Sequence, residues 1–208
     1  MAKTTRRSLF ALPFLGNGQA QLDPDAAKEA LEARARIAQQ HFPNVTLFTH
    51  ESKPVRFYDD LIKGKIVLIN VMYAECQGVC PGITANLVKV QKLLGNRVGK
   101  EVFMYSMTLK PEHDSPRVLE EYRRMHAIGP GWTLLTGKPA DIELLRQRLG
   151  FTTPNPSVDK DTSQHIGNVR YGNEPLMLWG ACPGSSSPKF MLELISRVIH
   201  PEGTARKA

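Results

Sequence analysis

Hydrophobic runs alternate with amphipathic segments along most of the chain. Residues 66–73 and 102–107 are nearly continuous in apolar side chains, which is typical of strands buried on both faces. Residues 82–94, which follow the first of these runs, carry apolar side chains at helical spacing. Strands that alternate with helices predict an α/β domain with a central, mostly parallel sheet and with helices on both faces.

Further helices are predicted where a capping residue or a proline precedes good helix formers, at residues 23–40, 115–126, 139–150 and 187–199. Shorter strands are predicted at residues 45–49, 55–58 and 132–135. A late hairpin, with strands at 169–171 and 176–179, adds an antiparallel edge. This layout fits a thioredoxin-like fold, in which a cis-proline commonly stands beside the active cysteines. For Glu174–Pro175, a cis bond and a trans proline in a turn both stay open.

Composition and charge exclude several classes of protein. The 208 residues are 41% hydrophobic and 23% charged, as in a globular protein that buries a core without disulfides. The net charge of +7 is partly carried by Lys3, Arg6 and Arg7, and the remaining basic residues are interleaved with acids. We therefore expect no nucleic-acid partner. No apolar run approaches the roughly 20 residues of a transmembrane span.

The first twenty residues have the order of an export signal. A basic start with Arg6-Arg7 precedes a short apolar stretch at residues 9–15 and the small-residue pattern Gly18-Gln19-Ala20. The pattern resembles a twin-arginine signal and predicts cleavage near Ala20 and a place in the bacterial periplasm. A basic N-terminus on a cytoplasmic chain stays open. The predicted parts are a signal at 1–20, a peripheral helix at 21–42, a thioredoxin-like copper-binding domain at 43–200 and a tail at 201–208.

Two of the three cysteines, Cys76 and Cys80, lie between the first buried strand and the helix after it. A spacing of four residues is one helical turn, so the sulfurs can face the same way. The N-terminus of a helix favours the thiolate form. Two close thiolates can form a disulfide or bind a soft metal ion, and an incidental pair also stays open. The spacing is one residue longer than in thioredoxin, and Tyr73 stands where a peroxidatic site needs threonine.

The order of motifs over residues 45–199 resembles the Sco/SenC copper chaperones. The motifs are Cys76-x-x-x-Cys80-Pro81, residues 105–116 against the family's S-x-D-P-x-x-D-T/S-P, residues 133–137 against its GLTG, and a late histidine, His165. The resemblance implies that Cys76, Cys80 and His165 bind one copper ion. It also implies delivery of that ion to the dinuclear copper site of cytochrome c oxidase during its assembly. Cu(I) prefers thiolates, and imidazole also suits Cu(II).

The implied partner is the copper-binding subunit of a terminal oxidase, with other periplasmic copper or thiol proteins as further candidates. Two alternatives stay open. The chain could be a thiol-disulfide oxidoreductase that uses Cys76 and Cys80 as a redox pair on the cysteines of the oxidase copper site, or a copper or redox sensor. The family often has proline at the position of Gln77 and aspartate at that of Gln164, and its S-x-D-P aspartate is absent. Cys182 has no counterpart, so an inert thiol, a further sulfur ligand or resolving thiol, and intermolecular pairing all stay open.

Overall fold

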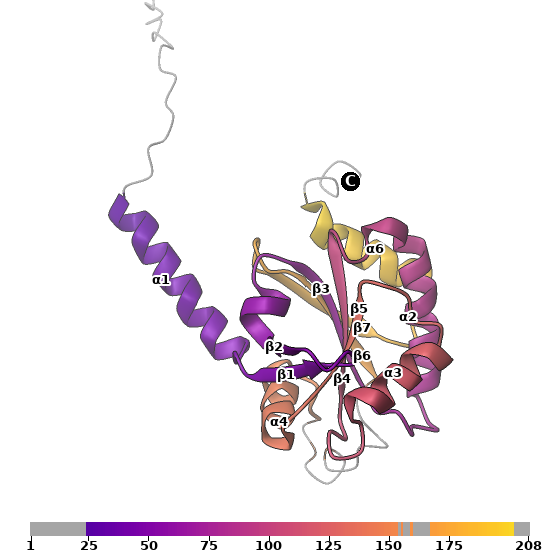
Figure 1. Cartoon of the computed structure of the whole chain (residues 1–208). Coiled ribbons are helices and arrows are strands. Elements are labelled where there is room, and N and C mark those ends of the chain that lie inside the picture. The colour runs from indigo at the N-terminus through magenta and orange to yellow at the C-terminus, as the bar shows by residue number, and fades with distance from the viewer. Residues whose placement is uncertain (1–23, 154, 156–158, 160–166, 202–208) are drawn as a thin grey trace, which may run out of the picture. The chain divides into compact units, whose positions relative to one another are not determined.

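The computed structural model of the chain describes residues 24–153, 155, 159 and 167–201 (Figure 1). The chain forms two compact units, Met1–Arg36 and Ile37–Ala208. Helix α1 (Pro24–His41) confirms the helix predicted over residues 23–40. The predicted signal and its cleavage site lie outside the described residues. Within the described residues, no helix combines the length and the apolarity needed to cross a membrane.

The second unit is built on a sheet whose strands, as far as the structure describes the chain, follow the order β2-β1-β5-β4-β3-β6-β7. Their bounds are β1 (Thr46–Thr49), β2 (Pro54–Arg56), β3 (Ile66–Met72), β4 (Val102–Thr108), β5 (Trp132–Gly137), β6 (Asn168–Asn173) and β7 (Leu178–Pro183). The two predicted long strands, β3 and β4, occupy the middle of the sheet and are buried along nearly their whole length.

Parallel pairing is confined to the centre of the sheet. Strand β4 pairs in parallel with β3 and with β5, whereas the other four pairings are antiparallel. The predicted α/β, thioredoxin-like class is confirmed, but the sheet is mixed instead of mostly parallel. The hairpins at the two ends of the sheet, β1–β2 and β6–β7, give two of the antiparallel pairings, and the other two arise where each hairpin joins the central strands, at β1–β5 and β3–β6.

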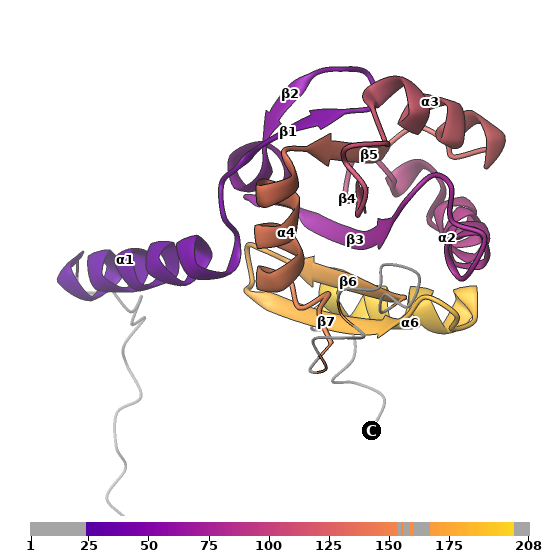
Figure 2. The same ribbon diagram turned by 90° about the horizontal axis from the view of Figure 1, so that it is seen from below.

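Helices cover both faces of the sheet, as predicted (Figure 2). One apolar core lies under α2 (Cys80–Leu94), α3 (Pro116–Met125) and α6 (Pro188–Ile199). A second core, on the other face, includes residues of α4 (Pro139–Arg148) and of the short π-helical turn η1 (Phe57–Ile62). The cysteines belong to the first core, so the two faces of the sheet have separate surroundings.

The prediction of a strand through residue 58 is wrong, because β2 ends at Arg56 and η1 follows. Side chains stabilise this turn: the carboxylate of Asp60 accepts the backbone N–H of Arg56 at 2.6 Å, and the amide oxygen of Asn44 accepts that of Tyr58 at 3.1 Å. The buried residues of η1 all face the core from a segment only six residues long. So short a helical segment leaves no periodic pattern to recognise.

The late hairpin is displaced from its predicted register. Strand β7 begins at Leu178 instead of residue 176, and Leu176 and Met177 belong to the turn. Met177 has φ of 54°, a left-handed conformation that strands do not use. The described peptide bonds are all trans, so Pro175 is a trans proline in a turn.

Candidate metal centre

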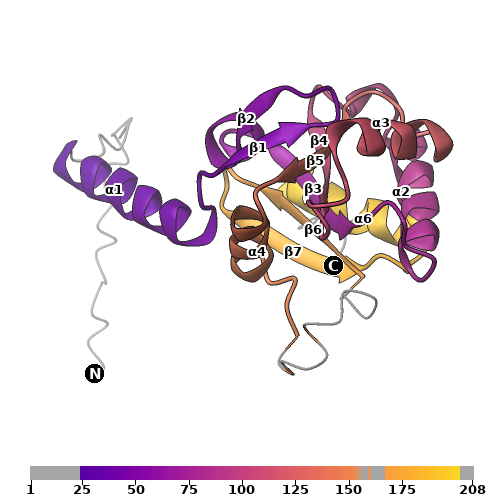
Figure 3. The same ribbon diagram turned by 60° about the horizontal axis from the view of Figure 1, so that its bottom comes forward.

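The cysteine loop lies at the edge of the sheet where the parallel strands end, which Figure 3 turns toward the viewer. Strand β3 stops at Met72, and α2 begins at Cys80. The side chains of Cys76 and Cys80 are 6% and 1% exposed, while Glu75, Gln77 and other residues of the loop stand in solvent. Neither thiol is part of a disulfide, and both are buried under an exposed loop.

The two thiols hydrogen-bond to each other, and their pKa values move apart. Burial alone raises the pKa of a thiol, but bonds to the Cys76 sulfur from the Cys80 thiol and from the backbone N–H groups of Cys80 and Gly78 outweigh it. The pKa of Cys76 therefore lies below its ordinary value. The pKa of Cys80 rises to about 12, first through burial and then because its thiol donates to Cys76. Cys76 is therefore the more nucleophilic sulfur of the pair, and Cys80 keeps its proton.

A buried carboxylate holds the cysteine loop to the next strand. Asp114 is 1% exposed and accepts the backbone N–H of Ala74 at 3.0 Å and the hydroxyl of Thr108. The Thr108 hydroxyl oxygen in turn accepts the backbone N–H of Lys110 at 3.0 Å. The sequence motif around residues 105–116 contains Asp114, but its contact with a loop 40 residues earlier follows only from the parallel packing of β3 on β4.

Two tyrosines border the thiols. The Tyr122 hydroxyl lies 2.8 Å from the hydroxyl of Thr84, one turn after Cys80 in α2. Burial, with a smaller contribution from the two cysteines, raises the pKa of Tyr122 to about 12, so this phenol stays neutral. Tyr73 carries the ammonium of Lys110 over its ring at 4.2 Å. Sequence reasoning did not single out Tyr122, because its place beside the cysteines depends on how α3 packs against α2.

The third predicted ligand, His165, lies outside the described residues. The next described residue is Gly167, which lies against the first turn of α2. A Cβ atom at Gly167 would come within 2.6 Å of Ile83 Cδ1 and 3.9 Å of Val79 Cγ2. The backbone N–H of Gly184 donates to the Gly167 carbonyl at 2.6 Å and fixes this position. The described residues contain no cluster of three or more His, Cys, Asp or Glu side chains that could hold a metal ion. They contribute two sulfurs, and the chain at Gly167, two residues after His165, lies against the first turn of the helix that begins at Cys80.

The third thiol, Cys182, lies on β7 opposite Val169 of β6 and is 4% exposed. Burial raises its pKa above the ordinary value, so it is a protonated side chain of the core. Two histidines outside the proposed ligand set, His50 and His126, make structural contacts. Nδ1 of His50 accepts the backbone N–H of Leu134 at 3.2 Å. His126 packs on the Tyr122 ring at 4.1 Å between centroids.

In the reduced, metal-free chain, Cys76 is expected to react with iodoacetamide before Cys80. The reagent attacks the thiolate, and the pKa of Cys76 is lowered while that of Cys80 is raised. Labelling of Cys76 should slow as the pH falls through its lowered pKa. Cys80 should be labelled only in strongly alkaline solution, where its thiol loses the proton. Peptide mapping by mass spectrometry measures both rates. Equal rates, or Cys80 reacting first, would contradict the assignment.

The SCO1/SenC family profile matches residues 33–200 of the chain. The chain belongs to the SCO1/SenC family. Among curated proteins it is similar to the SCO1 protein homolog of Bacillus subtilis, with 29% identity over 77 residues, which are 36% of this chain and 39% of that protein. The chain thus matches about two fifths of the length of the curated relatives.

Solved structures share the fold of this SCO1/SenC chain. Copper-bound ScoI of Bradyrhizobium japonicum has a TM-score of 0.61 at 21% identity, over 76% of this chain and 98% of that one. BsSco, described as having a disulfide switch and as a member of the Sco family of cytochrome c oxidase assembly proteins, has a TM-score of 0.62 at 19% identity, over 77% and 94%. These likenesses confirm the thioredoxin-like architecture.

Proposed function

We propose that this SCO1/SenC chain binds one copper ion through Cys76, Cys80 and His165 and delivers it to the dinuclear copper site of cytochrome c oxidase during its assembly. The observation that carries the proposal is the pair of hydrogen-bonded, buried thiols where β3 passes into α2. Two sulfurs already in contact need little rearrangement to share one ion. Support for oxidase assembly comes from the family and from the description of BsSco.

The donor set fits copper. Thiolates select soft Cu(I), and one imidazole makes the set acceptable to Cu(II) as well. Binding removes the proton that Cys80 holds, because the ligand is the thiolate. Three ligands leave copper coordinatively open, so that a thiolate of a recipient protein can enter before the first sulfur leaves. Such an opening suits a carrier more than a permanent site.

His165 is the residue on which the proposal depends most. The Gly167 segment lies against Ile83 and near Val79, at the first turn of the cysteine helix, and this supports a ligand role for the histidine two residues earlier in sequence. The preceding Gln164 differs from the family's aspartate, and Asp161 is the nearest carboxylate before it in sequence. The proposal places the chain in the periplasm after removal of residues 1–20, on the side of the membrane where the recipient subunit would present its copper site.

A second function, reduction of the cysteines of the recipient's copper site, is favoured by the split pKa values of the two thiols. In this reaction the Cys76 thiolate attacks a disulfide of the target and forms a mixed disulfide. Cys80 then loses its proton and displaces the target's second sulfur. Two electrons pass to the target, and a Cys76–Cys80 disulfide remains. His165 has no part in it.

Copper transfer from the reduced, loaded chain to a purified copper-binding domain of an oxidase subunit tests the proposal, with His165→Ala as the variant. We expect the wild type to transfer one equivalent, and the variant to bind copper more weakly and to change the Cu(II) spectrum. Both metal-free proteins should reduce a disulfide in the target at similar rates. An affinity and a spectrum unchanged in His165→Ala would exclude the three-ligand site and leave the oxidoreductase function.

A further inference from the structure

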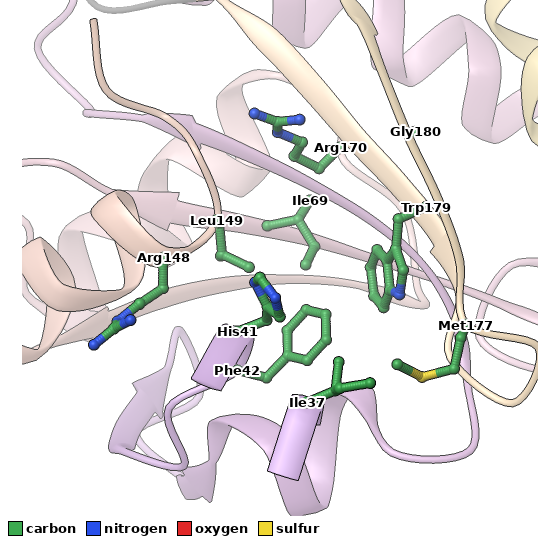
Figure 4. A pocket seen from close by; sticks show the side chains of 10 residues that line it. All are labelled: Ile37, His41, Phe42, Ile69, Arg148, Leu149, Arg170, Met177, Trp179 and Gly180. Carbon is green, nitrogen blue, oxygen red and sulfur yellow. The ribbon is translucent and has the colours of Figure 1, made fainter. Parts of the chain in front are cut away.

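A cavity of about 380 Å³ lies on the face of the sheet that is opposite to the cysteines (Figure 4). Its floor is Ile69 of β3, and apolar walls come from Phe42, just after α1, and Leu149, just after α4. Trp179 of β7 closes another side, with its ring 4.7 Å from that of Phe42. The proposed copper site uses none of these residues.

The polar groups of the cavity are nearly all donors or cations. The side chains of Arg170, Arg148, His41 and Trp179 line it, and none of the described residues that line it is acidic. Arg170 stands on β6 between Ile69 of β3 and Ala181 of β7 in the sheet register. Its guanidinium donates to the Gly150 carbonyl at 2.6 Å, and no carboxylate of the described residues forms an ion pair with it.

Two of these donors are buried without an acceptor among the described residues: Nε of Arg170 and Nε1 of Trp179. They project from the same face of the hairpin, because Trp179 pairs with Gly172, two residues along β6 from Arg170. The indole lies directly on Gly172, where a Cβ atom would come within 2.1 Å of the ring, so Trp179 is held in place. A buried donor without a partner costs stability, and such groups call for an explanation.

We propose that this cavity binds a small organic carboxylate with an apolar body. The apolar part packs on Ile69, Leu149 and Phe42, and the carboxylate pairs with the guanidinium of Arg170, next to Trp179. A cation is excluded by the lining, and a neutral apolar molecule would leave the donors unpaired. The net charge is +7 and stays positive when Lys3, Arg6 and Arg7 are removed with residues 1–20, which also favours an anionic ligand over long distances.

The two tryptophans provide an internal control for the test. Trp132 lies in the other core and donates its indole N–H to the Ser106 hydroxyl at 2.8 Å, whereas Trp179 borders the cavity. In an NMR titration of the full chain with 1-naphthoate, the indole signal of Trp179 should shift with saturation and that of Trp132 should stay. Decanoate tests whether an aliphatic body serves as well. 1-Naphthalenemethanol, which has the same body without the charge, should bind at least about tenfold more weakly, as the loss of a charged hydrogen bond predicts.

Arg170→Gln should weaken 1-naphthoate binding by a similar factor, and Arg117→Gln, on the exposed surface of α3, should leave it unchanged. Cys80→Ser should bind the carboxylate as the wild type does, so that failure of the copper proposal is separable from failure of this one. The proposal is overturned if neither carboxylate gives a saturable shift of the Trp179 signal, or if the neutral alcohol binds as tightly as 1-naphthoate. The comparison of ligands needs no substituted protein, so it holds even if Arg170→Gln does not fold.

Discussion

Replacing Cys80 by serine is expected to abolish stoichiometric copper binding by the reduced chain. The hydroxyl is a hard, protonated donor where copper needs a thiolate, and the remaining sulfur of Cys76 is a single soft ligand. The loss should exceed the roughly 10–100-fold that removal of an outer partner of a metal ligand costs. Cys76→Ser should have the same result, because the two sulfurs are in contact and act as one site. Metal analysis after gel filtration measures the ratio of copper to protein.

Cys182→Ser is the matched control, since it also replaces a buried thiol of the same core by a hydroxyl. It is expected to retain one copper per chain while losing a little thermal stability. If Cys182→Ser released copper and Cys80→Ser kept it, the metal would lie on the hairpin and not in the cysteine loop. Far-UV circular dichroism of all three variants separates loss of the site from loss of the fold.

Gly184→Ala is expected to weaken copper binding from a position outside the proposed ligand set. A Cβ atom there would lie 2.8 Å from the Gly167 carbonyl oxygen and 2.7 Å from Ile83 Cγ2. Contacts that short push the Gly167 segment away from α2 and strain the bond that the Gly184 N–H makes to it. We expect this shift to displace His165, the proposed ligand two residues before Gly167. Overpacking of this kind costs about 1–3 kcal/mol of stability, and displacement of a ligand should lower copper affinity by roughly 10–100-fold.

The control for this variant is Gly82→Ala, in the first turn of α2 and close to the cysteines in sequence. A Cβ atom at Gly82 has nothing within 4 Å, and alanine in a helix is favoured over glycine by roughly 0.5–1 kcal/mol. Gly82→Ala should therefore keep or raise stability and leave copper affinity unchanged. Chemical denaturation and a competition titration with a Cu(I) chelator measure the two quantities. Equal copper affinities for both variants would show that the Gly167 segment does not position a ligand.

The sequence predicts the parts of this fold that depend on local pattern. Strands β3 and β4 and helix α2 are long, apolar or periodic, and the spacing of Cys76 and Cys80 brings their thiols together in the structure. Strand β7 is different, because only Cys182 of its six residues is fully buried and no alternation marks its limits. Its register is set by pairing with β6, which local reasoning does not see.

Long-range contacts account for what local reasoning missed at the site. Asp114 reaches the backbone of Ala74 across 40 residues, and Tyr122 meets Thr84 across 38. Both contacts follow from the way β4 and α3 pack beside β3 and α2, and neither leaves a local signal. Only the family resemblance indicates His165, since a single histidine among six carries no spacing pattern. The sequence alone does not mark Gly167 and Gly184 as important, because their role follows from their contacts with Ile83 in the structure.

X-ray absorption at the copper edge, on the reduced chain loaded with one equivalent of Cu(I), tests the central claim most directly. With zinc bond lengths as a guide, the proposed site predicts two sulfur scatterers at about 2.3 Å and one imidazole nitrogen at about 2.0 Å. The nitrogen scatterer should be lost in His165→Ala while the sulfur shell remains. A first shell made only of nitrogen and oxygen, or a spectrum that His165→Ala leaves unchanged, would contradict a copper site formed by Cys76, Cys80 and His165.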